Sequence, residues 1–206
     1  MNSATSTYDS SSKRYIQKLL RPTARRVAAL GVTANQVTLT TIVVSLATGA
    51  VALAFAGSRW PLLLIPAALL VRLVCNHVDG LIAREYGTAT RLGGVLNDLS
   101  DIVADAALYL PLAVAPGIDP ALVLPAATLG PIVEAASLAA AAQGLPRRHD
   151  GPLAKKPRGV LFGLVALALG LGAAPGVWLD VTLAAAVVLL VATILNRLNK
   201  ALHAER

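Results

Sequence analysis

The stretch PLLLIPAALLVRLVCNHVDGLIA, residues 61–83, decides what kind of fold this chain can form. A helix needs about 20 mostly apolar residues to cross a bilayer, and this stretch is long enough. Near its end it carries Asn76 and Asp79. A carboxylate at membrane depth is expensive unless it is paired, hydrated or bound to a cation. The stretch therefore predicts a membrane helix and, on the same helix, a functional site.

The composition of the whole chain agrees with a location in lipid. Of its 206 residues, 56% are hydrophobic and only 14% are charged, which leaves too little polar surface to cover a soluble globule. No alternating pattern indicates a barrel, so helices are the expected spanning elements. The net charge of +7 comes from basic residues beside apolar segments, where anionic lipid is a nearer partner than nucleic acid. We predict an all-α integral membrane protein that binds no nucleic acid.

Apolar segments on both sides of residues 61–83 extend the pattern to six predicted membrane-spanning helices. Their ranges are 37–56, 61–83, 92–114, 121–142, 160–174 and 177–195. We expect the whole chain, 1–206, to be one domain in which residues 37–195 form the six-helix bundle.

The basic residues predict how these helices are oriented. Arg84, Arg91 and the basic residues of 147–158 lie in loops on the same side as both termini, whereas the opposite loops hold Arg59. Because cytoplasmic loops carry the excess of arginine and lysine, we predict a multi-pass inner-membrane protein. Both termini and the site around Asp79 are then cytoplasmic.

The N-terminal residues form two predicted segments. Residues 1–12 are polar, are not followed by a cleavable signal core, and are expected to be flexible. In residues 13–30, apolar side chains such as Tyr15, Leu19 and Ala24 recur at helical spacing among basic ones. This pattern is typical of an amphipathic helix lying in the membrane interface. The alternative is a basic flank that only fixes the topology.

Polar residues gather on two neighbouring helices. Asn76 and Asp79 are three residues apart, and Asn97, Asp101 and Asp105 follow one another at every fourth position. Each set therefore lines one helix face. Ligands that offer only oxygen favour a hard cation such as Mg²⁺, Mn²⁺ or Ca²⁺ over zinc. The pattern predicts a metal site between these two helices.

The spacing of these residues resembles a known signature. Asp79-Gly80-x-x-Ala83-Arg84, eight further residues, Gly93, and then Asn97 and Asp101 is similar to the motif of the CDP-alcohol phosphatidyltransferases. The resemblance implies transfer of a substituted phosphate from a CDP-linked lipid, expected to be CDP-diacylglycerol, to an alcohol, with release of CMP. It also implies one or two Mg²⁺ or Mn²⁺ ions, a role in phospholipid biosynthesis and a homodimer.

The resemblance also assigns a role to each motif residue. Asn76, Asp79, Asn97 and Asp101 would ligate metal, and Asp101 would be the base that accepts the acceptor's proton. The nucleotide and its diphosphate would lie against Gly80, Ala83, Arg84 and Gly93. Arg84 offers a planar fork of donors suited to phosphate.

Two positions depart from the family motif. Asn76 and Asn97 stand where the family has its first and third aspartates, and a neutral amide compensates less cation charge than a carboxylate. The site then holds metal more weakly or holds one ion, or Asp98 or Asp105 substitutes, or catalysis is lost. The resemblance extends to a bacterial branch with asparagine at both places. Asp105 has a second interpretation, as a buried acid paired with a neighbouring span, for instance through Asn196.

The sequence says less about which residues bind the acceptor alcohol. Lys155 and Arg158, in the basic segment before the fifth span, are candidates for binding a phosphorylated acceptor or anionic headgroup. Their alternative role is as topology signals that contact surface lipid. Two other functions remain open: a catalytically silent relative that binds CDP-lipid, and an ion-coupled transporter. A transporter would spread its acids through the bilayer or carry broken helices in two related halves.

Overall fold

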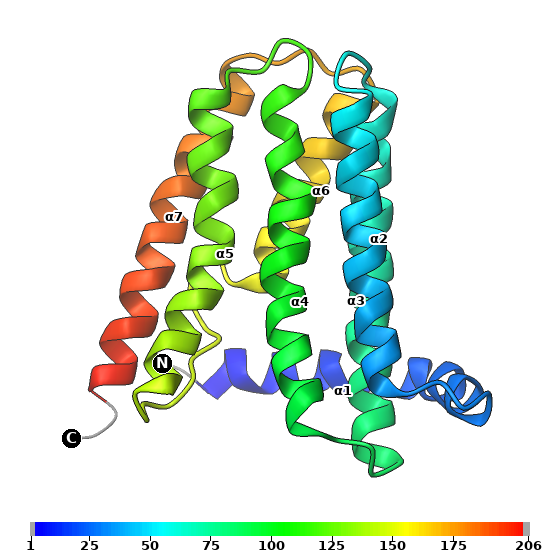
Figure 1. Cartoon of the computed structure of the whole chain (residues 1–206). Helices are drawn as coiled ribbons and strands as arrows, with labels where there is room; N and C mark the ends of the chain where they lie inside the picture. The colour runs from blue at the N-terminus through cyan, green and yellow to red at the C-terminus, as the bar shows by residue number, and fades with distance from the viewer. Residues whose placement is uncertain (1–2, 204–206) are drawn as a thin grey trace. The chain divides into compact units, whose positions relative to one another are not determined.

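The computed structural model describes residues 3–203 and the side chains from Tyr15 onward. Residues 1–2 of the predicted flexible tail lie outside this range. Every regular element in the described part is a helix (Figure 1). In chain order they are α1 (Ser3–Ala29), α2 (Ala34–Ala54), the 3₁₀ helix η1 (Trp60–Leu63), α3 (Leu64–Glu85), α4 (Arg91–Tyr109), η2 (Leu110–Val114), α5 (Pro120–Ala142), α6 (Lys155–Gly170) and α7 (Val177–Leu202).

These helices confirm an all-helical membrane protein and match the predicted ranges closely. Among the described residues, four segments are long and apolar enough to cross a bilayer: α2, Trp60–Glu85, α5 and α7. The other two predicted spans are helical but differ in character. Helix α6 has only 16 residues, and α4 carries Asp98, Asp101 and Asp105. Six spans and an interfacial α1 therefore stay predictions.

Local capping explains where two functionally important helices begin. At the start of α2, Thr33 N donates to Gln36 Oε1 at 2.8 Å and Gln36 N donates to Thr33 Oγ1 at 3.3 Å. This reciprocal pair is a capping box, which satisfies two backbone donors of the first turn. At the start of α4, Gly93 N donates to Thr90 Oγ1 at 2.9 Å. Both helix N-termini are thus fixed by nearby side chains.

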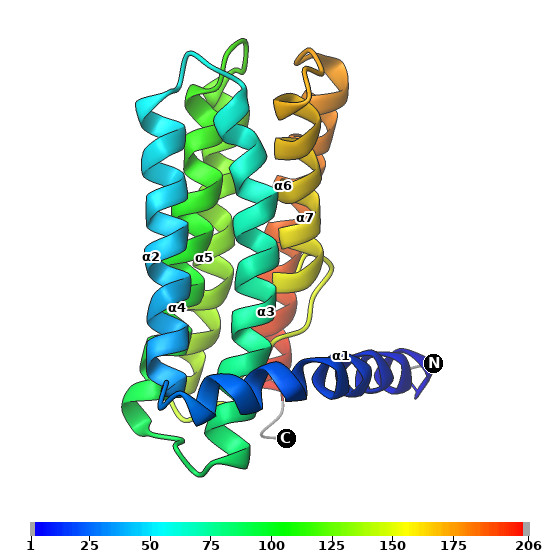
Figure 2. The ribbon, with the colours of Figure 1, turned by 90° about the vertical axis from the view of Figure 1, so that its right-hand side faces the viewer.

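The chain divides into two compact units, and the first comprises the chain up to Ile42 together with Leu70–Ser100. Its core joins Ala24 of α1 to α2 and to α3, which contributes the buried Leu81 and Ile82. Within this unit, α1 runs across the ends of α2 and α3 (Figure 2). Arg21 Nη2 of α1 lies 2.7 Å from Glu85 Oε1 at the end of α3.

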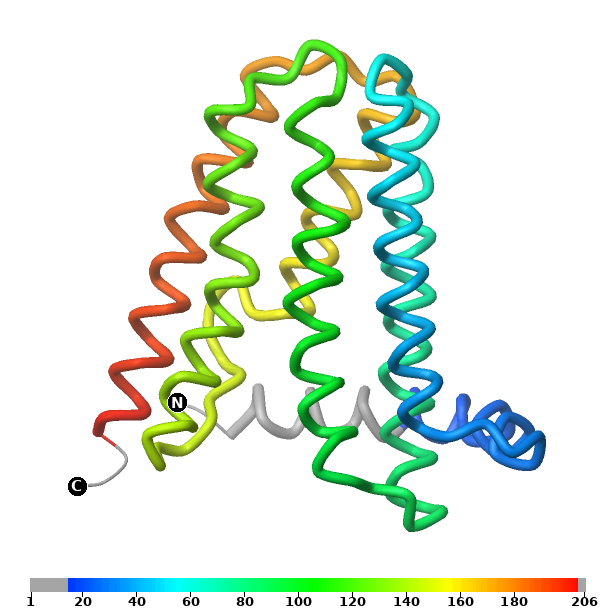
Figure 3. The backbone as a smooth tube through the Cα atoms, viewed as in Figure 1, coloured from blue at the N-terminus to red at the C-terminus, as the bar shows by residue number. Residues whose placement is uncertain are grey.

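The second unit comprises Val43–Leu69 and the chain from Asp101 onward. In it α5 packs against α7, as the backbone trace shows (Figure 3). The rings of Tyr109 and Phe162, both fully buried, stack with their centroids 4.1 Å apart. Small side chains such as Ala127 and Ala186 are also fully buried, because small residues let membrane helices approach closely.

One close helix approach in this second unit gives a stability prediction. A Cβ atom added at Gly49 of α2 would lie 2.2 Å from the backbone oxygen of Ala107 in α4, which cannot rotate away. Overpacking of this kind destabilises proteins by about 1–3 kcal/mol, so Gly49→Ala should lower the free energy of unfolding by that amount in detergent micelles. Gly57→Ala is the control, because its added Cβ meets no atom within 4 Å. Equal stability of the two variants would contradict the close approach.

Candidate functional site

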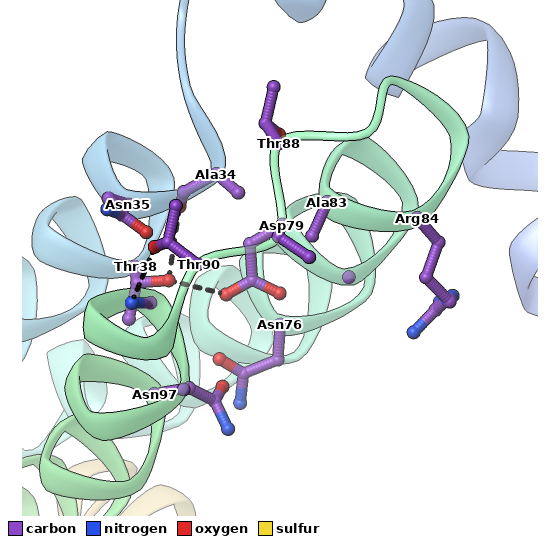
Figure 4. Close-up of a pocket in the computed structure, with 14 residues that line it drawn as sticks. Ala34, Asn35, Thr38, Asn76, Asp79, Ala83, Arg84, Thr88, Thr90 and Asn97 are labelled. Atoms are coloured by element: carbon purple, nitrogen blue, oxygen red, sulfur yellow. Dashed lines mark hydrogen bonds between the residues drawn. The ribbon is translucent and has the colours of Figure 1, made fainter.

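A cavity of about 360 Å³ lies in the first unit, between the start of α2, the end of α3 and the start of α4 (Figure 4). Cavities of this size accommodate small molecules. We call it the amide pocket, after its three asparagines. Its lining comprises Ala34, Asn35, Thr38, Asn76, Asp79, Gly80, Ala83, Arg84, Thr88, Ala89, Thr90, Gly93, Gly94 and Asn97. The pocket thus brings together the predicted nucleotide-binding residues and three of the predicted metal ligands.

Among the described residues that line the amide pocket, Asp79 is the one with a carboxylate side chain. Its side chain is buried, and its Oδ2 accepts a hydrogen bond from Thr38 Oγ1 at 2.8 Å. Thr38 comes from the second turn of α2, so this bond ties α2 to α3 at the pocket. The sequence pattern does not indicate Thr38, because a threonine in an apolar helix usually bonds its own backbone, as Thr38 also does with Ala34 O at 3.1 Å.

The two asparagines of the motif lie beside this carboxylate. Figure 4 shows the side chain of Asn76 next to that of Asp79, with Asn97 beside Asn76. Asn76 Oδ1 is buried and has no hydrogen-bond partner within the described chain. A buried acceptor without a partner costs about 1–3 kcal/mol. Oxygen ligands from amide and carboxylate suit Mg²⁺ or Mn²⁺, so the residues present fit a hard divalent cation.

Two glycines make room for polar groups in the pocket. A Cβ at Gly93 would lie 2.6 Å from Asn35 Oδ1, and a Cβ at Gly80 would lie 3.1 Å from Arg84 Nη1. The guanidinium of Arg84 therefore lies over the backbone of Gly80. Because α2 and α4 both begin at the pocket, their N-terminal N–H groups favour an anion there. The pocket can accept phosphate on one side and a cation on the other.

Asp101 follows Asn97 by one helical turn on α4 but belongs to the second unit. Its Oδ1 lies 2.5 Å from Lys155 Nζ, at the first residue of α6. The candidate base and one of the candidate acceptor-binding residues are therefore an ion pair. Among the described residues, no group of three or more His, Cys, Asp and Glu side chains forms a metal cluster, because amides occupy two of the motif positions.

Asp105 lies one turn further along α4 and is fully buried. Its Oδ2 accepts from Arg158 Nε at 2.8 Å and lies 2.5 Å from Arg158 Nη2. The pairing with another helix that the sequence allowed is therefore present, but with Arg158 of α6. Asn196 instead donates to Asp150 Oδ2 at 3.3 Å. Asp98 is half-buried and does not line the amide pocket.

Arg158 is also part of a larger set of buried charges. Its Nη2 donates to Glu134 Oε1 of α5 at 3.0 Å, and Arg197 Nη1 of α7 donates to Glu134 Oε2 at 3.2 Å. We call Asp105, Glu134, Arg158 and Arg197 the buried arginine network. Its two carboxylates and two guanidinium groups balance in charge and connect α4, α5, α6 and α7. The sequence pattern does not indicate Arg197, because an arginine near the end of a span usually extends to the membrane surface.

Arg197 also anchors the basic loop between α5 and α6. Its Nε donates to Asp150 O at 3.0 Å and its Nη2 donates to His149 O at 3.2 Å. Leu153 N donates to Thr193 Oγ1 at 2.9 Å, and Lys200 Nζ pairs with the Asp150 carboxylate. Partial burial opposes ionisation of Asp150, but the hydrogen bond and charge of Lys200, a backbone hydrogen bond and the hydrogen bond from Asn196 together outweigh it and hold the pKa of this carboxyl below its usual value. The loop that leads to Lys155 is therefore fixed to α7.

The chain is similar to a known family and to a bacterial membrane protein over most of its length. The family model described as CDP-alcohol phosphatidyltransferase matches residues 31–198. The inner membrane protein YnbA of Escherichia coli (strain K12) is 35% identical over 190 residues, which cover 92% of this chain and 94% of that protein.

Two solved structures of the phosphatidylinositol phosphate synthase PgsA1 from Mycobacterium tuberculosis share the fold. The structure with CDP-DAG bound has a TM-score of 0.73 and 23% identity, and covers 90% of this chain and 94% of that one. The complex with manganese and citrate has a TM-score of 0.70 and 24% identity, and covers 88% of each chain.

Proposed function

The chain belongs to the CDP-alcohol phosphatidyltransferase family, and on that premise we propose that it transfers a substituted phosphate from CDP-diacylglycerol to an alcohol and releases CMP. The observation that carries this proposal is the amide pocket. It places Asp79, Gly80, Ala83, Arg84 and Gly93 around one cavity, in a chain whose helices suit a membrane. A lipid-linked nucleotide needs both features.

Within this proposal, the nucleotide's diphosphate lies between Arg84 and the start of α4. Arg84 donates to phosphate oxygens, and Gly80 and Gly93 let the nucleotide approach the backbone closely. Ala83 shapes the cytidine side of the pocket. The lipid donor is supported by the structure of PgsA1 with CDP-DAG bound.

Asp79 would hold Mg²⁺ or Mn²⁺ with the amide oxygens of Asn76 and Asn97, whereas Asp101, which the resemblance also assigns to the metal, is paired with Lys155. When bound, the cation offsets the negative charge that develops on the diphosphate and the departing CMP. The PgsA1 complex with manganese supports this choice of ions. Thr38 keeps the Asp79 carboxylate oriented through its 2.8 Å hydrogen bond.

Asp101 is the proposed general base. The acceptor hydroxyl gives its proton to the Asp101 carboxylate while its oxygen forms the new bond to phosphorus, and the bond from phosphorus to the CMP oxygen breaks. General bases of this kind contribute about 10²–10⁴-fold to the rate. Lys155, at 2.5 Å from Asp101 Oδ1, would orient this carboxylate and approach the acceptor.

Arg158 was predicted to bind the acceptor, and the geometry favours a different role. All of its guanidinium nitrogens donate to protein groups: Asp105, Glu134 and Leu153 O. A fully buried side chain with these partners positions the start of α6, where Lys155 lies. We therefore assign Arg158 and Asp105 to the support of the site and leave Asp98 as the alternative metal ligand.

We further propose a multi-pass protein of the inner membrane with six spans, forming one domain. The inner-membrane location of the Escherichia coli relative supports this assignment. Exposed Tyr15 and Leu19 beside exposed basic residues support an α1 that lies in the interface. Both termini and the amide pocket would face the cytoplasm. The protein would form a homodimer.

Mass spectrometry of membrane lipids tests the proposal directly. Cells that express the chain should accumulate a phospholipid with a new headgroup, which identifies the acceptor, and cells that express Asp101→Asn should not. The matched comparison removes the carboxylate without changing side-chain size. An unchanged lipid profile, with CDP still binding to the purified protein, would indicate a silent CDP-lipid-binding relative instead.

A further inference from the structure

We propose that the amide pocket takes up one divalent cation together with the CDP diphosphate, as a unit, and does not hold the cation tightly beforehand. This inference rests on the proposed function, because it concerns the same nucleotide and the same pocket. It adds the order and the stoichiometry of binding, which follow from the charges on the described residues.

The pocket has too little negative charge to hold a divalent cation tightly without a further anion. Asp79 is the carboxylate among its described lining residues, and Arg84 carries the opposite charge in the same lining. The other polar groups are neutral amides and hydroxyls: Asn35, Thr38, Asn76, Thr88, Thr90 and Asn97. Affinity for such cations rises with the number of charged ligands. A bound ion would therefore leave positive charge that the protein does not compensate.

The two carboxylates on the same face of α4 as Asn97 already have cationic partners in the second unit. Asp101 Oδ1 lies 2.5 Å from Lys155 Nζ, and Asp105 Oδ2 lies 2.5 Å from Arg158 Nη2. A metal ion that used either carboxylate would have to compete with a resident lysine or arginine. A second ion is therefore disfavoured, and the negative charge that compensates the first ion must come from a bound ligand.

The pocket nevertheless has the shape of a cation site. Asn76 Oδ1 is a buried acceptor without a hydrogen-bond partner, and it lies beside Asp79 and Asn97 (Figure 4). The oxygen ligands are thus arranged before binding, while the compensating charge is absent. A diphosphate carries that charge, and Arg84 and the helix N-termini are placed to receive it. Cation and diphosphate should therefore bind cooperatively.

The experiment measures this cooperativity without turnover. Mn²⁺ binding to the purified full-length protein in detergent is followed by electron paramagnetic resonance, with and without CDP, and CDP binding is followed by calorimetry, with and without Mn²⁺. We expect one Mn²⁺ per chain and a coupling of about 5- to 150-fold, the usual range for linked sites. By reciprocity, CDP should tighten Mn²⁺ binding by the same factor as Mn²⁺ tightens CDP binding.

Restoring a carboxylate should uncouple the two ligands. Asn76→Asp places a charge at the buried acceptor, so Mn²⁺ alone should bind at least about tenfold more tightly, which corresponds to 1.4 kcal/mol, and CDP should add less. Asn97→Asp should act in the same direction if Asn76→Asp does not fold. Asn199→Asp, on an exposed position of α7, is the matched amide-to-acid control and should change neither affinity.

The outcomes separate this inference from the proposed function. Two Mn²⁺ ions per chain, or Mn²⁺ binding that CDP does not change, would overturn the inference while leaving the transferase proposal intact. CDP binding that is independent of Mn²⁺ would do the same. If CDP binds neither with nor without Mn²⁺, both the inference and the proposed function fail.

Discussion

Asp79→Asn should reduce the rate of CMP release from CDP-diacylglycerol by about a thousandfold, the upper range for removing one group that stabilises charge in a transition state. The change removes the carboxylate of the amide pocket but keeps its size, so Thr38 still has an oxygen to bond. Without this charge, no described lining residue offers an anionic ligand. The measurement is chromatographic quantification of CMP from purified protein with Mn²⁺ and the acceptor that lipid analysis identifies.

Asp180→Asn is the matched control for this prediction. Asp180 is exposed in the first turn of α7, so its variant should retain the activity. Asp98→Asn tests the alternative metal ligand: a loss as large as that of Asp79→Asn would show that Asp98, which does not line the amide pocket, replaces one of the missing acidic ligands. Turnover by Asp79→Asn at the rate of the unmodified protein would remove Asp79 from the metal site.

Arg197→Met should lower the free energy of unfolding by about 3–5 kcal/mol, the range for removing one partner of a buried ion pair. Arg197 is 1% exposed and donates to Glu134 Oε2, Ser137 Oγ and the carbonyl oxygens of Val133, His149 and Asp150. Its loss leaves two buried carboxylates, Glu134 and Asp105, with Arg158 as the remaining cation of the network. The measurement is denaturant unfolding in micelles, followed by circular dichroism.

A double-mutant cycle isolates the charge balance. Glu134→Gln alone leaves two arginines and one carboxylate, Asp105, in the network, whereas Glu134→Gln with Arg197→Met leaves the neutral Asp105–Arg158 pair. The double variant should therefore lose less stability than the sum of the two single variants.

Lys200→Met is the control for the same region of α7. Lys200 pairs with Asp150, but both side chains are roughly half exposed, and such pairs contribute about 0–1 kcal/mol. If Arg197→Met loses no more stability than Lys200→Met, the buried arginine network does not stabilise the fold.

The network also bears on activity through Lys155. Arg158 fixes the start of α6, and Arg197 fixes the loop before it. These contacts hold the backbone that presents Lys155 to Asp101. In the proposed mechanism, buried charges that never touch substrate thus determine where the base and its partner lie.

The sequence by itself determined the helices and the motif. Apolar length depends on the residues of one segment alone, so ranges such as 61–83 and 121–142 agree with Trp60–Glu85 and α5 within a few residues. The recurrence of Asn76 with Asp79, and of Asn97 with Asp101, places each pair on one face by helix geometry. Both are local properties.

Only the tertiary structure decided which charges neutralise one another. The position of Arg158 in the sequence does not show whether its side chain binds substrate or is buried against Asp105 and Glu134. The same is true of Lys155 against Asp101 and of Thr38 against Asp79. The partners come from different helices, and a buried charge takes whichever opposite charge packing brings within hydrogen-bond distance. This pairing depends on how the helices pack, and the hydrophobic periodicity of a single segment does not encode that packing.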